Sequence, residues 1–296
     1  MTTSLTRLAN GLSVVSHAMP HLETISLGVW VSCGARHESD SEQGISHLLE
    51  HMAFKGTGSR SARDIAEEIE EVGGELNAAT SLESTSYYAR VLKGDEAVAL
   101  GLLSDILQNS RFAEDELERE RDVILQEIAA TRDSPEEIAY DLLHEAAYPA
   151  QPLGRPILGT PDSVSAFESS DLRRFLGSRY RAGSMVLSAA GAVDHERLVR
   201  HAEALFGGLP EGADRIETAA NYGGGRRVSD KPFEQVHVML GFEGPSYRSA
   251  DFFTAQVFSG LLGGGMSSRL FQEVRERRGL CNAIYSTAWG LSDAGL

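Results

Sequence analysis

Two histidines and a glutamate stand close together in the segment His47-Leu48-Leu49-Glu50-His51. In an α-helix, His47 and His51 project from one face about one turn apart, which suits two ligands of a single tetrahedral Zn²⁺. Glu50 lies beside them on the same face of the helix. The same histidines are also compatible with ordinary core or surface positions, because a five-residue pattern recurs by chance. The motif therefore predicts a zinc site only if a further ligand exists.

A catalytic zinc ion requires a third protein ligand and one open position. Residues 114–131 combine many acids with a helical spacing of apolar residues. Within them Glu120 and Glu127 are seven residues apart, so both carboxylates lie on one stripe of the helix, two turns apart. The other acids of this stretch fit a solvated helix face. Glu120 and Glu127 are therefore the candidates for the third ligand.

The histidine motif falls in a predicted helix that follows a predicted strand. Residues 25–32 have the composition of a strand, and residues 41–54 carry apolar side chains at helical spacing. A second helix is predicted to begin after Ser61, with Asp64 completing a capping box, and to end at Gly73-Gly74. The strand and the first helix together must position the histidines.

The remaining elements extend this unit over about 210 residues. Strands are predicted at residues 5–8, 12–15, 76–80, 84–92 and 185–190, and helices at 97–107, 114–131, 134–148, 171–180 and 195–206. Residues 211–232 contain three consecutive glycines and few apolar side chains, which is typical of a linker. We therefore predict a first domain over residues 1–210 and a linker over 211–232.

Residues 233–296 look like the start of a second copy of the first domain. A predicted strand at 236–242 is followed by a predicted helix at 252–262, a glycine- and serine-rich turn, a helix at 270–277 and a strand that begins near Cys281. The histidine motif is missing from this copy, which breaks off at Leu296. We expect the second domain to be incomplete and the sequence to be a fragment or a truncated product.

Composition excludes several classes of protein. The chain has 27 Lys and Arg against 43 Asp and Glu, a formal net charge of −16, which argues against nucleic-acid binding and favours cationic or extended peptide partners. It contains no apolar run of the ~20 residues that cross a bilayer, and its N-terminus does not resemble a secretory signal. Cys33 and Cys281 are far apart in the sequence, which suits free thiols in a reducing compartment. We expect a cytoplasmic protein without membrane contact.

The spacing of the chemical residues resembles that of the pitrilysin/insulinase-type zinc metallopeptidases. His-x-x-Glu-His is followed after 69 residues by Glu120 and after six more by Glu127, and the flanking segments 44–46, 52–57 and 120–125 match as well. Within the family the chain is most similar to the β subunit of the mitochondrial processing peptidase and its bacterial homologues. The resemblance implies one Zn²⁺ per chain, held by His47, His51 and Glu127. It also implies Glu50 as general base and Glu120 as a carboxylate that orients a ligand imidazole.

The same resemblance implies a set of substrate-binding residues. Residues 74–80 are similar to the edge strand to which an extended peptide adds, with Asn77 and Ala78 in contact with it, although Asn77 taken alone is as compatible with a turn. Glu137 and Asp141 are similar to an acidic pair that binds a substrate arginine, whereas by themselves they fit a solvated helix face. Arg275 corresponds to an arginine that reaches the substrate carbonyl from the second half.

Position 282 departs from the family pattern, because Asn282 stands where a tyrosine is expected seven residues after the arginine. The expected fold is α+β, with two related α/β-roll units, each a mostly antiparallel sheet packed with helices. The expected function is zinc-dependent hydrolysis of extended peptides or presequence-like segments, by a homodimer or a heterodimer with a related subunit. The alternative is a non-catalytic partner subunit, since the second half is incomplete and Asn282 replaces the tyrosine.

Overall fold

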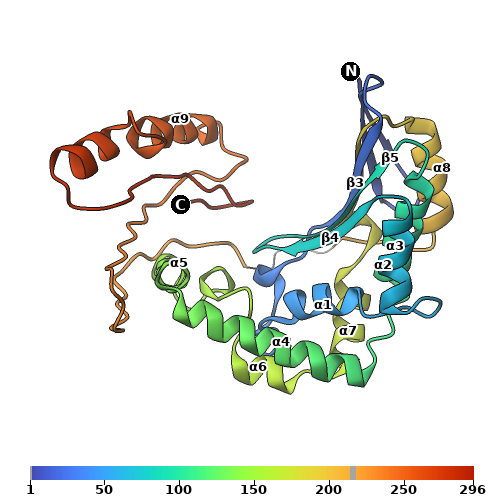
Figure 1. Ribbon diagram of the computed structural model, residues 1–296, viewed down its shortest axis with the longest axis horizontal. Helices are drawn as coiled ribbons and strands as arrows, with labels where there is room; N and C mark the ends of the chain where they lie inside the picture. The colour runs from blue at the N-terminus through green and yellow to red at the C-terminus, as the bar shows by residue number, and fades with distance from the viewer. Residues whose placement is uncertain (1, 214–217) are drawn as a thin grey trace. The chain divides into compact units, whose positions relative to one another are not determined.

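The computed structural model describes residues 2–213 and 218–296 of the chain (Figure 1). Contacts divide these residues into two compact units. The first unit comprises residues up to Ser134 together with those from Arg155 to 213, and the second comprises Pro135–Gly154 together with Thr218–Leu296. The proposed boundaries at 210 and 232 stay a prediction, and residues 1 and 214–217 lie outside the described residues.

A six-stranded, mostly antiparallel sheet forms the centre of the first unit, as expected for the predicted fold class. Its strands are β1 (Thr2–Arg7), β2 (Ser13–Ala18), β3 (Thr24–Val31), β4 (Glu75–Thr80), β5 (Thr85–Leu92) and β6 (Met185–Gly191). They pair in the order β1-β2-β6-β3-β5-β4, and only the β2–β6 pair is parallel. The strand β4 is therefore an edge strand, with β5 on one side.

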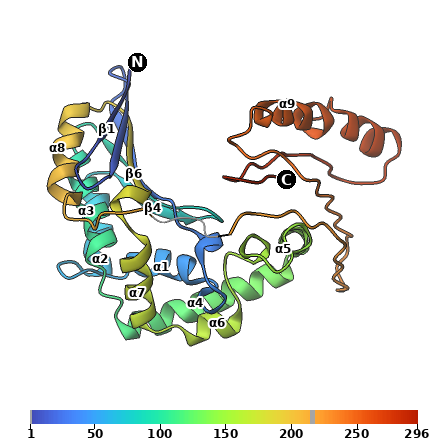
Figure 2. The same ribbon diagram turned by 180° about the vertical axis from the view of Figure 1, so that it is seen from behind.

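Helices cover one face of this sheet, as Figures 1 and 2 show for α2, α3 and α8. The helices of the unit are α1 (Ile45–Ala53), α2 (Ala62–Glu71), α3 (Glu96–Gln108), α4 (Glu114–Asp133), α6 (Pro161–Ala166), α7 (Ser169–Arg179) and α8 (His195–Phe206). Along β3, Val29 and Val31 are fully buried against the helices, whereas Trp30 between them is half exposed on the other face. This alternation follows from the two-residue period of a strand.

The second unit contains the helices α5 (Pro135–Ala147) and α9 (Phe252–Gly263), and a π-helical segment over Phe271–Arg277. Both predicted helices after residue 250 are therefore confirmed in position. The predicted strands at 236–242 and near Cys281 are not formed. Val236, Val238 and Leu240 alternate as a strand would, yet they are 89%, 74% and 79% exposed. A strand forms only when a neighbouring strand accepts its hydrogen bonds, and the described residues of this unit form no strand beside this segment.

Among the described residues, the structure contains no helix that combines the length and apolar character needed to cross a membrane.

Candidate metal centre

The helix α1 presents the histidine motif on its half-buried face. Its apolar residues Ile45, Leu48, Leu49 and Met52 are buried in the core, which leaves His47, Glu50 and His51 on the opposite side. The amphipathic spacing therefore decides both that this segment is a helix and which side chains remain available for chemistry.

His47, His51 and Glu127 converge on one point between α1 and α4. The Oε2 atom of Glu127 lies 3.8 Å from Nε2 of His47 and 3.9 Å from Nε2 of His51. Ligand atoms around a tetrahedral Zn²⁺ with bonds near 2.0–2.1 Å are about 3.4 Å apart. The three side chains form a group of possible metal ligands whose atoms all lie within 4.8 Å of one another. A small inward movement of each side chain would bring them to bonding distance.

Two further observations fit a metal at this point. Burial, and then the neighbouring His51, lower the pKa of His47 to about 4. The imidazole is therefore neutral near pH 7, which is the form that binds a metal ion. The Oε2 atom of Glu50 is buried without a hydrogen-bond partner in the part of the chain that the structure describes. Because a buried carboxylate oxygen without a donor is costly, Glu50 fits a site that holds a water molecule.

Lys55 and Glu120 form an ion pair next to the Nδ1 atom of His51. Lys55 Nζ contacts Glu120 Oε1 at 2.6 Å, and Glu120 Oε2 lies 3.0 Å from His51 Nδ1. Burial would raise the pKa of Glu120, but the hydrogen bonds from Lys55 and His51 outweigh it and hold the pKa below its usual value. An ionised Glu120 accepts a proton from Nδ1 of His51, which leaves Nε2 as the unprotonated nitrogen, the form of an imidazole that ligates metal ions.

Lys55 is a site residue that the sequence reasoning did not single out. It follows the end of α1 at Ala53 by two residues and lies within the segment 52–57 that resembles the zinc metallopeptidases. That resemblance was the available signal, and only the folded chain shows that Lys55 pairs with the buried Glu120.

Replacing Glu120 by glutamine is expected to weaken zinc binding by about 10- to 100-fold, because the imidazole of His51 would lose its charged acceptor. Lys55→Met should weaken it in the same direction by a smaller factor, since Glu120 keeps its bond to His51. Competition with a coloured chelator measures both affinities. Glu118→Gln, an exposed change on the same helix, is the matched control. An affinity of Glu120→Gln within twofold of the control would contradict this role.

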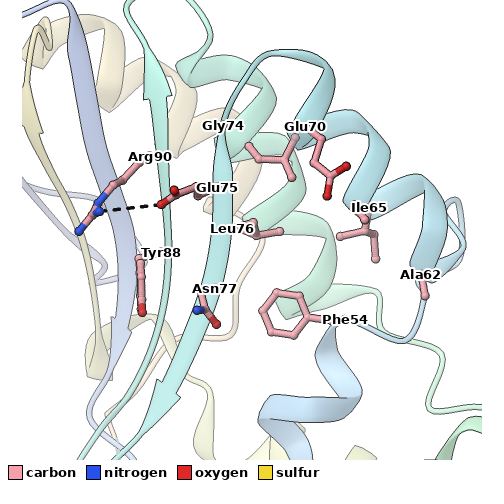
Figure 3. Close-up of a pocket in the computed structure, with 12 residues that line it drawn as sticks. Phe54, Ala62, Ile65, Glu70, Gly74, Glu75, Leu76, Asn77, Tyr88 and Arg90 are labelled. Carbon is pink, nitrogen blue, oxygen red and sulfur yellow. Dashed lines mark ion pairs between the residues drawn. The ribbon is translucent and has the colours of Figure 1, made fainter.

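The edge strand β4 lies beside a cavity of about 510 Å³ (Figure 3). Phe54, Ile65 and Leu76 contribute apolar walls, and Asn77 and Tyr88 also line it. The backbone N–H of Ala78 donates to Oδ1 of Asn77 at 2.8 Å. An amide that bonds a side chain of its own strand is directed away from β5 and toward the open edge. Asn77 and Ala78, predicted to contact substrate, thus lie at a free edge of the sheet.

The other predicted substrate-binding residues belong to the second unit. Glu137 and Asp141 lie on α5, where burial, and then the nearby Glu137, raise the pKa of Asp141 to about 6. Arg275 donates from Nε to the carbonyl oxygen of Asn282 at 2.9 Å, and its guanidinium lies over the ring of Phe271. The structure therefore gives Arg275 partners within its own unit.

The chain matches two family models that divide it between them. Residues 13–161 match the insulinase model of peptidase family M16, and residues 166–296 match the model of the inactive domain of the same family. An uncharacterized zinc protease of Rickettsia felis is 44% identical over 294 residues, which cover 99% of this chain and 71% of that protein. The β subunit of the mitochondrial processing peptidase of Lentinula edodes is 38% identical over 311 residues, with 99% of this chain and 66% of that protein covered.

Solved structures show the same fold. A protease from Helicobacter pylori superimposes with a TM-score of 0.89 at 25% sequence identity, over 99% of this chain and 73% of that chain. A peptidase M16 inactive domain from Pseudomonas fluorescens superimposes with a TM-score of 0.86 at 20% identity, over 100% of this chain and 73% of that chain. The histidine motif, the convergent glutamate and these matches lead to one conclusion: the chain belongs to the insulinase family of peptidases, peptidase family M16.

Proposed function

We propose that this protein is a zinc-dependent endopeptidase that hydrolyses peptide bonds of extended peptides or presequence-like segments. The observation that carries the proposal is the convergence of His47 Nε2, His51 Nε2 and Glu127 Oε2. The unpartnered Oε2 atom of Glu50 on the same helix supports it. One Zn²⁺ per chain, bound by these three ligands, would supply Lewis-acid activation of a water molecule and of the peptide carbonyl.

The protein's own residues would move the protons. Glu50 takes a proton from the attacking water and passes it to the nitrogen of the leaving amine, so one carboxylate serves first as base and then as acid. Glu120 holds His51 in one orientation and one tautomer through the bond to Nδ1.

An extended peptide would bind along the free edge of β4. Its main-chain carbonyl would replace Asn77 Oδ1 as the acceptor for the N–H of Ala78, which is the way a peptide adds a strand to a sheet. The adjoining cavity, with Phe54 and Leu76 in its wall, would receive an apolar side chain of the substrate. Hydrogen bonds to the peptide backbone select an extended conformation but hardly distinguish one amino-acid sequence from another. Sequence specificity must therefore come from sites that bind the side chains of the substrate.

The acidic pair Glu137 and Asp141 would supply such a site for a substrate arginine. The pKa of Asp141, raised to about 6, means that its carboxylate loses its charge as the pH falls through 6. We expect the KM for an arginine peptide to rise by about fivefold between pH 7.5 and 5, equivalent to about 1 kcal/mol for a partly exposed ion pair. At each pH, the KM of the arginine peptide is divided by the KM of a matched peptide with norleucine in place of arginine. Because pH effects on the metal centre act on both peptides, they cancel in this ratio.

Asp141→Asn provides the control for this pH dependence. In that variant the ratio of the two KM values should be nearly constant over the same pH range, and the arginine preference should already be low at pH 7.5. If Asp141→Asn kept the wild-type preference for arginine at every pH, Asp141 would not take part in substrate recognition.

Two further features belong to the same proposal. Neither Cys33 nor Cys281 forms a disulfide among the described residues, which suits a reducing compartment and supports a cytoplasmic location. The relative named as a processing-peptidase subunit supports a working unit of two chains, either a homodimer or a heterodimer with a related subunit. A non-catalytic partner role stays the second candidate, because Asn282 stands where the family pattern has a tyrosine.

Zinc analysis combined with a cleavage assay tests the function. The chain is assayed on an arginine-containing, presequence-like peptide, alone and in a version whose second half has the length of the relatives. Zinc near one equivalent and cleavage that a chelator stops would support the endopeptidase. Zinc without cleavage in either version would favour the non-catalytic partner, and absence of zinc from both versions would refute the proposal.

A further inference from the structure

The N-terminus of α1 lacks a side-chain cap of the ordinary kind. The residue before the helix is Gly44, in a left-handed conformation with φ +89°, and it has no side chain with which to bond the first turn. The first backbone N–H groups of a helix have no partner within the helix. Something else must therefore bond the amides at the start of the helix that carries His47 and Glu50.

The carboxylate of Glu38 takes this place. Its Oε2 atom accepts the N–H of Gly44 at 2.8 Å, and its Oε1 atom accepts the N–H of Ser46 at 2.9 Å. Glu38 is only 4% exposed, so these bonds are shielded from water. Both oxygens of one buried carboxyl group are thus used to bond the start of a single helix.

The segment from Glu38 to Gly44 is in turn held by residues far along the chain. Arg155 donates to the backbone oxygen of Glu38 at 3.1 Å and forms an ion pair with Asp40. Ser163 donates to the backbone oxygen of Gln43 at 2.7 Å. A side chain at position 44 would lie 2.7 Å from the carbonyl oxygen of Leu158. The segment that carries Glu38 is therefore held in place by these contacts while the Glu38 carboxylate bonds the first turn of α1.

We propose that Glu38 is a positioning residue for the metal centre, whose carboxylate caps α1 and fixes the orientation of its first turn. His47 follows directly after Ser46, whose amide Glu38 binds, and Glu50 stands one turn further along. A change in the direction of this turn would move a zinc ligand and the general base together. The inference rests on the proposed peptidase function, and it assigns a role to a buried acid that the hydrolysis itself does not use.

Glu38→Ala and Glu38→Gln test this role. Alanine removes both acceptors, whereas glutamine keeps one oxygen and turns an NH₂ group toward a backbone N–H. Because small displacements of reacting groups lower the rate of the chemical step strongly, kcat should fall by about 10- to 100-fold in Glu38→Ala and by less in Glu38→Gln. KM should stay within about twofold, since the edge strand β4 is not altered.

Asp194→Ala is the matched control. Asp194 caps α8 by accepting the N–H of Arg197 at 2.7 Å, and α8 carries none of the proposed site residues. The control should lose thermal stability as the Glu38 variants do, but its kcat per folded, zinc-loaded chain should equal that of the wild type. The absorption bands of bound Co²⁺ should shift in the Glu38 variants and stay unchanged in Asp194→Ala, because they report ligand geometry at the metal.

The outcomes separate the two proposals. If the wild type binds zinc and cleaves peptide, but both Glu38 variants match Asp194→Ala in kcat and in the Co²⁺ spectrum, the positioning role is wrong and the peptidase function stands. If the wild type binds metal without cleaving peptide, the peptidase function fails while the Co²⁺ spectra still decide the role of Glu38. If the wild type binds no metal, both fail. Should Glu38→Ala not fold, Glu38→Gln supplies the same comparison.

Discussion

Glu50→Gln is expected to lower the rate of peptide hydrolysis by about 10²- to 10⁴-fold while zinc stays bound. Glutamine has nearly the shape of glutamate but cannot accept the proton of the attacking water. Glu50 is not among the three convergent ligands, so its replacement leaves the metal-binding atoms in place. The measurements are kcat/KM on a fluorogenic peptide and the zinc content of the same sample after dialysis.

The size of this effect follows from the surroundings of Glu50. Its Oε2 atom is buried and without a hydrogen-bond partner among the described residues, so no protein donor occupies the oxygen that would accept the proton of the water. Glu118→Gln serves as the control and should retain wild-type activity. A Glu50→Gln protein that hydrolyses peptide at more than a tenth of the wild-type rate would falsify the assignment of Glu50 as general base.

His51→Ala is expected to abolish stoichiometric zinc binding and, with it, activity. One of three ligand atoms is lost, and Glu120 and Lys55 are left without the imidazole that they orient. The affinity should fall by more than the roughly 100-fold that the loss of an orienting partner costs. Zinc content by elemental analysis should drop from near one per chain to near zero.

Thermal unfolding gives an independent readout of the same change. A ligand that binds only the folded state raises the melting temperature by mass action, so added zinc should raise the melting temperature of the wild type and not that of His51→Ala. His201→Ala, on α8, is the control and should respond to zinc as the wild type does. Full zinc occupancy in His51→Ala would show that the metal binds elsewhere.

The two predictions differ in what they remove. Glu50→Gln removes proton transfer from a loaded site, whereas His51→Ala removes the metal from an intact fold. If both variants lost zinc, Glu50 would be a ligand rather than a base. If neither lost zinc, the convergence of His47, His51 and Glu127 would not be the metal centre.

The choice between the two glutamates of α4 shows where local spacing stops being informative. Glu120 and Glu127 are both on one stripe of the helix, about two turns or 10–11 Å apart along its axis, so only one can reach a given metal ion. The way α4 crosses α1 brings Glu127 to the open Nε2 atoms of the histidines and Glu120 to the Nδ1 atom of His51. Spacing alone could not decide this, because a crossing point depends on the packing of both helices.

The predicted strand at 236–242 shows the same limit for the fold. Alternating apolar residues favour an extended segment, and the pattern is present there as it is in β3. In β3 the neighbours β5 and β6 accept the hydrogen bonds, whereas the described residues of the second unit form no partner strand. Helices such as α9 satisfy their bonds internally, which is why their predictions depend less on the rest of the chain.

By itself, the sequence determined which segment forms the motif helix and that His47, Glu50 and His51 share the side opposite its apolar face, because helical periodicity acts over a few residues. The resemblance to the metallopeptidases already implied Glu127 as third ligand and Glu120 as the carboxylate beside an imidazole. Only the tertiary structure brought both glutamates to the histidines, placed Lys55 against Glu120, and showed that Glu38 bonds the start of α1. Most of these contacts join residues that are distant in sequence. The contact of Glu38 with α1 is local, but its segment is held in place by Arg155 and Ser163 from much later in the chain. Their geometry is therefore a property of the packed chain and not of any short stretch of it.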